Sequence, residues 1–275
     1  MKRKYKFAQS SAAYFNYTLR YAIKNLAELG YDGIEVWGGR PHAYRDDLLE
    51  ELSDLKALAD QLGIKVCNFI PAQFRYPSLL CSDNERVRTD SVTYIALAMR
   101  NAKALGSPSV SLCPGMVPWD RELETGRNQL MKSFRELSTI NKNYGLQLLI
   151  EPAHRFETNL ILTVEDCIRV LDQLADPVFG ILLDVGHCHV NDENLVEALK
   201  LASRYPMHIH LDDNMGDADT HLDIGEGKID FSNFKEGLDA VGYSGFLSIE
   251  LGTKYNMEPE KACRAGLEKL HKLFD

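Results

Sequence analysis

Residues 179–187 read FGILLDVGH, an apolar run that lacks the strict alternation of a half-exposed strand and ends in polar residues. Such a run is typical of a strand in a parallel sheet whose outer face is covered by helices. Similar runs recur along the whole chain, at 4–9, 33–38, 65–71, 109–114, 147–152, 207–213 and 245–251. The sequence therefore predicts eight strands of one parallel sheet.

The segments between these runs place apolar residues three and four positions apart, which is the spacing of an amphipathic helix. The clearest segments span 19–30, 46–63 and 91–106, and each ends on a glycine, the residue favoured at a left-handed helix C-terminus. Units of about 34 residues, each with one strand and one helix, account for the whole chain and close most naturally into a barrel. We therefore predict the α/β class, as a (β/α)8 TIM barrel that forms a single domain over residues 1–275.

The composition limits what such a barrel binds and where it works. The formal net charge is −9, whereas a nucleic-acid partner usually asks for a basic surface. No apolar stretch is long enough for a signal peptide or a membrane span, so we expect a cytoplasmic location and no membrane partner. The six cysteines include no CxxC pair and fall mostly in apolar runs, which predicts buried, reduced thiols. A small-molecule partner and a homo-oligomer, dimer or tetramer, are compatible with these features.

Polar side chains accompany the apolar runs in the second half of the chain. Glu151 ends the fifth run, Asp184 ends the sixth, His210 lies in the seventh and Glu250 ends the eighth. Active sites of such barrels are built at the carboxyl ends of the strands, so these side chains should meet at one mouth. Carboxylates that close repel one another unless a cation neutralises them. We therefore predict one divalent metal ion, Mn²⁺ in the first place, with Co²⁺, Mg²⁺, Zn²⁺ or Ni²⁺ as alternatives.

Four stretches carry a resemblance to a known family: LGYDGIEVWGGRPHAY (29–44), EPAHRFETN (151–159), DVGH (184–187) and DTHLDIGEGKI (219–229). They are similar to motifs of the xylose isomerase-like barrels, and most of all to the ketose 3-epimerases of the D-tagatose, D-psicose and fructoselysine types. The resemblance extends over essentially the whole chain. It implies an isomerase of carbohydrate metabolism, and within that class a sugar epimerase.

The resemblance also assigns the metal ligands. It implies that Glu151, Asp184, His210 and Glu250 hold the ion. The seventh run contains a second histidine, His208, and we expect only one of the two to face the barrel interior. The family motif selects His210.

Further residues are assigned to the substrate on the same ground. The resemblance implies that Glu157 and His187 contact the sugar. The ketohexose enzymes carry an arginine shortly after the histidine of the seventh strand, but no arginine occurs here between Arg204 and Arg264. His221 is expected to take that place. The departure favours a ketose that carries a substituent over a free ketohexose.

The predicted reaction dictates a pair of bases. Epimerisation beside a carbonyl removes a proton from one face of a carbon and returns one to the other, so two groups must flank that carbon. Glu151 and Glu250 are the predicted pair, with the metal stabilising a cis-enediolate between them. Trp37 is a candidate for stacking on the sugar and His42 for the edge of the mouth, whereas His154 is assigned to loop packing.

Three other functions stay open at this point. A lyase, a dehydratase or a C-glycoside-cleaving enzyme would start from the same metal-held enolate, and the sequence does not separate these reactions from epimerisation. A phosphodiester hydrolase of the endonuclease IV type needs a multi-zinc cluster with more histidines and a basic surface. A non-catalytic binding protein is disfavoured because every predicted metal ligand is present.

Overall fold

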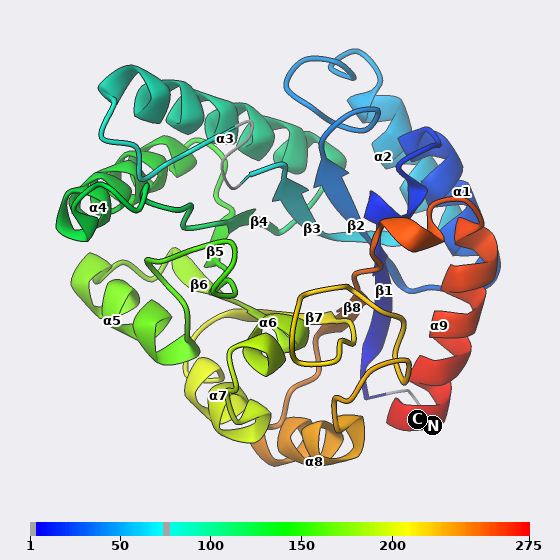
Figure 1. Cartoon of the computed structure of the whole chain (residues 1–275). Helices are drawn as coiled ribbons and strands as arrows, with labels where there is room; N and C mark the ends of the chain where they lie inside the picture. Colours follow the sequence, from blue (N-terminus) through cyan, green and yellow to red (C-terminus); the bar gives the residue numbers. More distant parts are fainter. Residues whose placement is uncertain (1–3, 74–77) are drawn as a thin grey trace.

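The computed structural model describes residues 4–73 and 78–275. Within these residues, eight parallel strands follow one another around a closed barrel in sequence order, and β8 pairs with β1 to close it (Figure 1). The strands are β1 (Lys6–Ser10), β2 (Gly33–Gly38), β3 (Lys65–Pro71), β4 (Ser109–Leu112), β5 (Gln147–Ile150), β6 (Phe179–Asp184), β7 (Met207–Leu211) and β8 (Phe246–Ile249). The predicted (β/α)8 barrel is confirmed.

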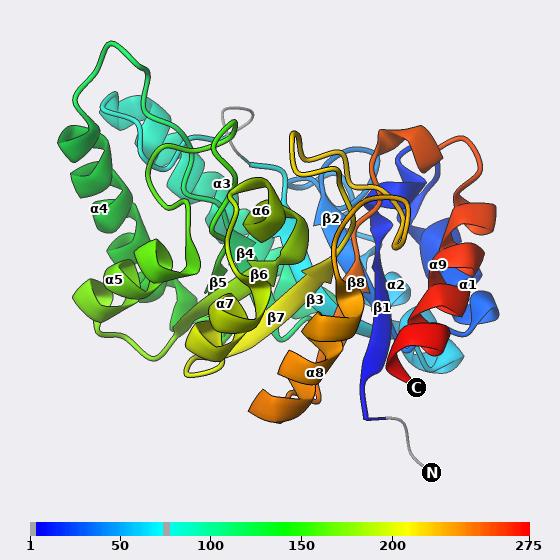
Figure 2. The same ribbon diagram turned by 60° about the horizontal axis from the view of Figure 1, so that its bottom comes forward.

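Helices surround the barrel, as Figures 1 and 2 show from two directions. Those in the described residues are α1 (Leu19–Leu29), α2 (Leu52–Leu62), α3 (Glu85–Leu105), α4 (Leu123–Asn141), α5 (Val164–Leu174), α6 (Val185–Val190), α7 (Leu195–Ala202), α8 (Phe231–Val241) and α9 (Pro259–Phe274), with 3-10 helices at Ser11–Tyr14 and Thr253–Tyr255. Their inner faces pack on the strands: the ring of Phe134 on α4 lies 5.9 Å from that of Phe179 on β6. Because helices cover the outside and side chains fill the interior, the strands are mostly buried on both faces, so they do not show the strict alternation of a half-exposed strand.

Two predicted helices begin at other residues than expected. α2 begins later, at Leu52, because the backbone amides of Asp47 and Glu51 bond to carbonyls three residues back, as in turns. α3 begins earlier, at Glu85, because the Asn84 side chain accepts hydrogen bonds from the first turn. The C-terminal ends are as predicted, on glycines with positive φ: Gly30, Gly63 and Gly106.

Strand β6 is shorter than its apolar run and ends at Asp184. The Asp184 side chain accepts a hydrogen bond from the backbone N–H of His187 at 2.9 Å and so begins helix α6. The other oxygen of Asp184, Oδ2, lies 3.4 Å from His210 Nδ1. Asp184 therefore belongs to both the helix cap and the barrel mouth, and His187 is carried by a helix.

The six cysteines are all buried and none of them forms a disulfide, as predicted from their apolar surroundings. Across residues 4–73 and 78–275, no helix combines the length and the apolar character that crossing a membrane requires.

Candidate active site

The four predicted metal ligands lie together at the carboxyl ends of neighbouring strands. Glu151 follows β5, Asp184 ends β6, His210 lies on β7 and Glu250 follows β8. One oxygen or nitrogen atom from each lies within 4.8 Å of the corresponding atoms of all the others. The strand register contributes, because Asp184 is paired with His210 across β6 and β7.

Distances within this cluster suit a shared cation. His210 Nδ1 lies 2.8 Å from Glu250 Oε2 and 3.4 Å from Asp184 Oδ2. It lies 3.7 Å from Glu151 Oε1. Ligand atoms about 2.0–2.3 Å from one ion are roughly 3–4 Å apart, so the cluster is close to the required size. Three carboxylates and one imidazole are also donors that divalent transition metals accept.

Two buried atoms of the cluster lack a hydrogen-bond partner among the described residues. They are Asp184 Oδ2 and His210 Nδ1. A buried polar atom left without a partner costs about 1–3 kcal/mol. A cation between them would satisfy both atoms, so the residues fit a divalent ion.

Glu151 has an unusual proton affinity in this setting. Burial raises the pKa of Glu151 to about 7, and the neighbouring carboxylates of Glu250 and Asp184 also raise it. The imidazoles of His187 and His210 act in the opposite direction and lower this pKa. A bound cation favours the charged form and lowers this pKa again. Without a cation, burial therefore favours the protonated form of this carboxyl group.

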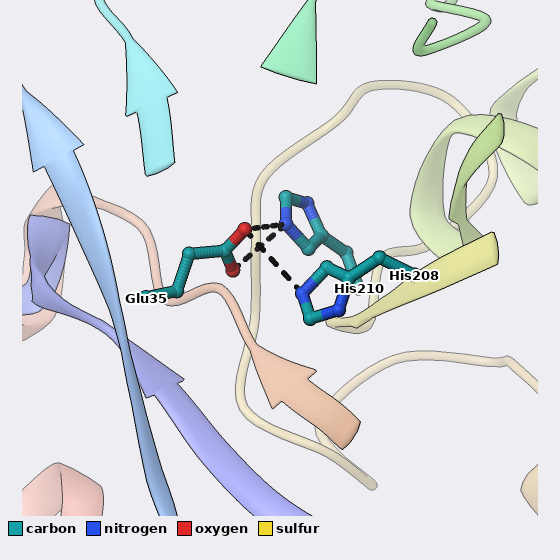
Figure 3. A group of neighbouring side chains, drawn as sticks. All are labelled: Glu35, His208 and His210. Carbon is teal, nitrogen blue, oxygen red and sulfur yellow. Dashed lines mark hydrogen bonds and ion pairs between the residues drawn. The ribbon is translucent and has the colours of Figure 1, made fainter. Parts of the chain in front are cut away.

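A glutamate that the sequence analysis did not single out lies behind the cluster. Glu35 of β2 is fully buried, and its carboxylate faces two imidazoles of β7 (Figure 3). Nε2 of His210 lies 2.9 Å from a Glu35 oxygen and Nε2 of His208 lies 3.4 Å from one. The prediction that only one of these histidines faces the interior is wrong, because residues two apart on a strand share a face. The signal for Glu35 was a charged residue inside the apolar run GIEVWG.

A second cluster lies beside the first and is centred on Asp219, in the loop after β7. Asp219 Oδ2 lies 2.8 Å from His221 Nε2 and 3.3 Å from His187 Nε2. His154 Nε2 lies 3.5 Å from the same oxygen and 3.4 Å from Glu157 Oε2. Although burial disfavours its charge, the imidazoles of His221 and His187 hold the pKa of Asp219 well below the usual value. We call these five residues the Asp219 cluster.

The structure thus brings the predicted substrate residues Glu157, His187 and His221 together, next to the metal cluster. His187 Nδ1 lies 3.8 Å from Glu151 Oε1. Sequence reasoning missed Asp219 and assigned His154 to loop packing, whereas both lie in this cluster.

The loop between β7 and α8 brings Asp219 and His221 to the mouth because Asp213 folds it back. The backbone of Asp213 pairs with that of Leu222. Its side chain accepts hydrogen bonds from three later backbone N–H groups, those of Gly225, Gly227 and Ile229. The turn-rich stretch DTHLDIGEGKI is therefore a fixed part of the mouth.

A cavity of about 230 Å³, partly open to solvent, borders both clusters. Trp37 lies in its wall, with its ring 4.0 Å from that of Phe15. His42, expected at the edge of the mouth, is instead fully buried, with Nδ1 3.0 Å from Ser11 Oγ and Nε2 3.1 Å from Tyr17 O. That prediction is wrong, because both ring nitrogens serve local packing. The lining residues are Trp37, Ile70, Pro71, Ala72, Gln73, Cys113, Glu151, Glu157, His187, His221 and Glu250.

Fold and site together define a class: a (β/α)8 barrel with a cluster of carboxylates and imidazoles, fit for a divalent ion, at the carboxyl ends of its strands. Residues 23–273 match the family model of the xylose isomerase-like TIM barrel, and the chain belongs to this family.

Within this family, the chain is similar to several individual proteins. The chain is 31% identical over 265 residues to fructoselysine 3-epimerase of Escherichia coli O157:H7, across 93% of this chain and 94% of that protein. The crystal structure of a D-tagatose 3-epimerase-like protein superposes with a TM-score of 0.80, at 26% identity over 97% of this chain and 98% of that one. The IOLI protein, whose structure contains a zinc atom, gives a TM-score of 0.82 at 21% identity over 98% of both chains. That last likeness shows the fold alone.

The resemblance noted in the sequence is therefore confirmed at the level of the family. The expected enzyme class, isomerase, is confirmed as well, because the characterised relatives that match over most of the chain are carbohydrate epimerases.

Proposed function

We propose that this protein is a divalent-metal-dependent sugar epimerase that inverts C3 of a ketose, above all of a ketose that carries a substituent. The observation that carries the proposal is the convergence of Glu151 and Glu250 with Asp184 and His210 at the mouth of the barrel. The match to fructoselysine 3-epimerase over 94% of that relative supports the reaction and the substrate class.

In this proposal Glu151, Asp184, His210 and Glu250 hold one ion, with Mn²⁺ in the first place and Co²⁺, Mg²⁺, Zn²⁺ or Ni²⁺ as alternatives. When bound, the ion supplies positive charge that stabilises the negative charge developing on the carbonyl oxygen of the substrate. The remaining chemistry falls to the side chains.

The two glutamates move the proton. One carboxylate accepts the proton from C3 and leaves an enediolate, and the other, protonated, donates a proton to the opposite face of the same carbon. Glu151 follows β5 and Glu250 follows β8, and β6 and β7 lie between these strands in the barrel. In this proposal the two carboxylates approach the substrate carbon from opposite faces. Burial raises the pKa of Glu151 and so opposes the lowering by a bound ion, which keeps the carboxylate basic enough to accept a proton.

The substrate-binding residues are Glu157, His187, His221 and Trp37, which all line the cavity. Glu157 and the two histidines position hydroxyl groups, and the indole of Trp37 offers an apolar wall for the carbon chain. His221, which stands where the ketohexose enzymes have an arginine, favours a substrate larger than a free ketohexose.

Metal analysis of the purified protein is expected to find about one divalent ion per chain, because the cluster offers one complete set of ligands. Asp184→Ala removes one ligand and should lower the content below about half an ion per chain. Asp54→Ala, at an exposed position on α2, is the matched control and should leave it unchanged. Equal content in the wild type and Asp184→Ala would contradict the ligand assignment. Two or more ions per chain would instead favour the multi-metal hydrolase, for which the Asp219 cluster offers further ligands.

Removing the ion is expected to lower the Tm by about 5 °C or more. An ion present at 100 times its Kd stabilises the native state by about 2.7 kcal/mol, and each kcal/mol moves the Tm of a chain near this size by about 2–4 °C. Calorimetry with EDTA, and again after Mn²⁺ is restored, measures the shift. Asp184→Ala should show no shift, and a wild-type Tm indifferent to EDTA would argue against a resident ion.

The reaction itself is tested by incubating the protein and Mn²⁺ with a panel of ketoses in D₂O. Deuterium at C3 of the recovered substrate and of its epimer, detected by NMR, is the expected result. Products that have lost a leaving group would favour the lyase, dehydratase or C-glycoside-cleaving alternative instead.

A further inference from the structure

Beneath the metal cluster, the barrel interior holds a layer of polar side chains. Barrel interiors are usually filled by branched apolar residues, and a polar group buried there is unfavourable unless it is hydrogen-bonded. This layer is drawn from β2, β3, β4, β7 and β8, and all of its members are buried: Glu35, Asn68, Ser109, Ser111, His208, His210 and Ser248. A layer of this kind indicates a role beyond filling the core.

Glu35 is the centre of the layer. Its Oε1 accepts a hydrogen bond from Asn68 Nδ2 at 2.6 Å, and its Oε2 accepts one from Ser248 Oγ at 2.7 Å. Asn68 is itself held by Ser109, whose hydroxyl donates to its Oδ1 at 2.6 Å. The carboxylate is therefore fixed from two sides, with its orientation toward β7 set by β3 and β8.

The third partner of Glu35 is His210, whose Nε2 lies 2.9 Å from the carboxylate (Figure 3). A carboxylate only accepts hydrogen bonds, so Nε2 of His210 must carry the hydrogen. In the neutral ring this leaves the lone pair on Nδ1. Nδ1 is the atom that lies 2.8 Å from Glu250 Oε2 and 3.4 Å from Asp184 Oδ2, at the centre of the metal cluster.

The other histidine of β7, His208, does not form a comparable hydrogen bond with Glu35. His208 Nε2 is 3.4 Å from Glu35 Oε1 and has no hydrogen bond of good geometry to any described residue. Of the two histidines, His210 is therefore the hydrogen-bond partner of Glu35.

We propose that Glu35 is a positioning residue of the metal centre. By accepting the Nε2 hydrogen of His210, it fixes the orientation and the tautomer of that ring, and so sets the affinity for the ion without touching ion or substrate. The proposal rests on the metal site of the proposed function. Partners that orient a metal-bound histidine in this way typically change metal affinity about 10- to 100-fold.

The first test is the apparent Kd for Mn²⁺, measured by competition with a fluorescent chelator. Glu35→Gln keeps the size of the side chain but offers an amide, which can donate to Nε2 and stabilise the wrong tautomer. We expect the Kd to rise by about 10- to 100-fold. Asp54→Ala, at an exposed position on α2 away from the barrel interior, is the control and should leave the Kd unchanged. A Glu35→Gln Kd within about threefold of the wild type overturns the proposal.

A second measurement, of the tautomer of His210, tests the proposal if Glu35→Gln does not fold. In wild-type protein with nitrogen-15-labelled histidine and bound Zn²⁺, Nε2 of His210 should carry a hydrogen and Nδ1 should not. The signals are assigned by their absence in His210→Gln. A hydrogen on Nδ1, or a bare Nε2, overturns the proposal. A wild type that binds neither Mn²⁺ nor Zn²⁺ would overturn the metal site and the proposed function as well, whereas a failure confined to the Glu35 tests leaves both standing.

Discussion

Replacing Glu151 by glutamine is expected to lower kcat by about 100-fold or more, and the same holds for Glu250. The amide has nearly the size of the carboxylate and keeps one oxygen near the ion, but it neither accepts nor returns a proton at neutral pH. Epimerisation needs a proton taken from one face of the carbon and one given to the other. The loss of either glutamate should therefore be sufficient to lower kcat by this amount. Initial rates of epimer formation from one ketose, at fixed Mn²⁺ and pH, measure the effect.

The control for this comparison is a glutamate outside the site. Glu197 lies exposed on α7, 2.8 Å from Lys200, and Glu197→Gln should keep wild-type activity. Metal content has to be measured in parallel, because a variant that has lost its ion loses activity for a different reason. If either glutamine variant kept near-full activity with the ion bound, the two-base mechanism would be wrong.

The barrel could be predicted because its signal is repeated along the chain. Seven of the eight strands lie within their predicted apolar runs, and β1 extends one residue beyond its run, to Ser10. The errors fall at element ends, where a single side chain decides: Asp184 ends β6 by capping α6, and Asn84 begins α3 ahead of its apolar pattern. Such caps depend on local geometry that an apolar pattern does not contain.

The convergence of the predicted ligands could be foreseen for a related reason. Parallel strands present their carboxyl ends on one rim, so an acidic residue directly after an apolar run, such as Glu151 or Glu250, is placed by the fold itself. Glu35 was missed because its partner His210 lies 175 positions away, across the barrel interior. Asp219 was missed because its place depends on a loop that Asp213 folds back. Contacts between distant segments leave no periodic trace in the sequence.

The proposed substrate preference is supported by polar groups in and beside the cavity that the described residues do not satisfy. Glu157 Oε2 and Asp219 Oδ1 are buried and have no hydrogen-bond partner among those residues. Both belong to the Asp219 cluster, beside the metal ligands. A substituent that carries hydrogen-bond donors, such as the amine of fructoselysine, would offer partners for such groups, and the cavity, with Trp37 and His221 in its wall, is partly open to solvent.

We therefore expect kcat/KM for a 1-substituted ketose, such as fructoselysine, to exceed that for fructose or psicose by at least about tenfold. A buried group left without a partner costs about 1–3 kcal/mol, and about 1.4 kcal/mol in the transition state already corresponds to a factor of ten. Both substrates should be run with the same ion and pH, with epimer formation followed by NMR. A free ketohexose that proved the better substrate would contradict the substrate proposal. The metal ligands and the two-glutamate mechanism would survive that result, because Glu151, Asp184, His210 and Glu250 are argued from the strand ends and not from the loop that carries His221.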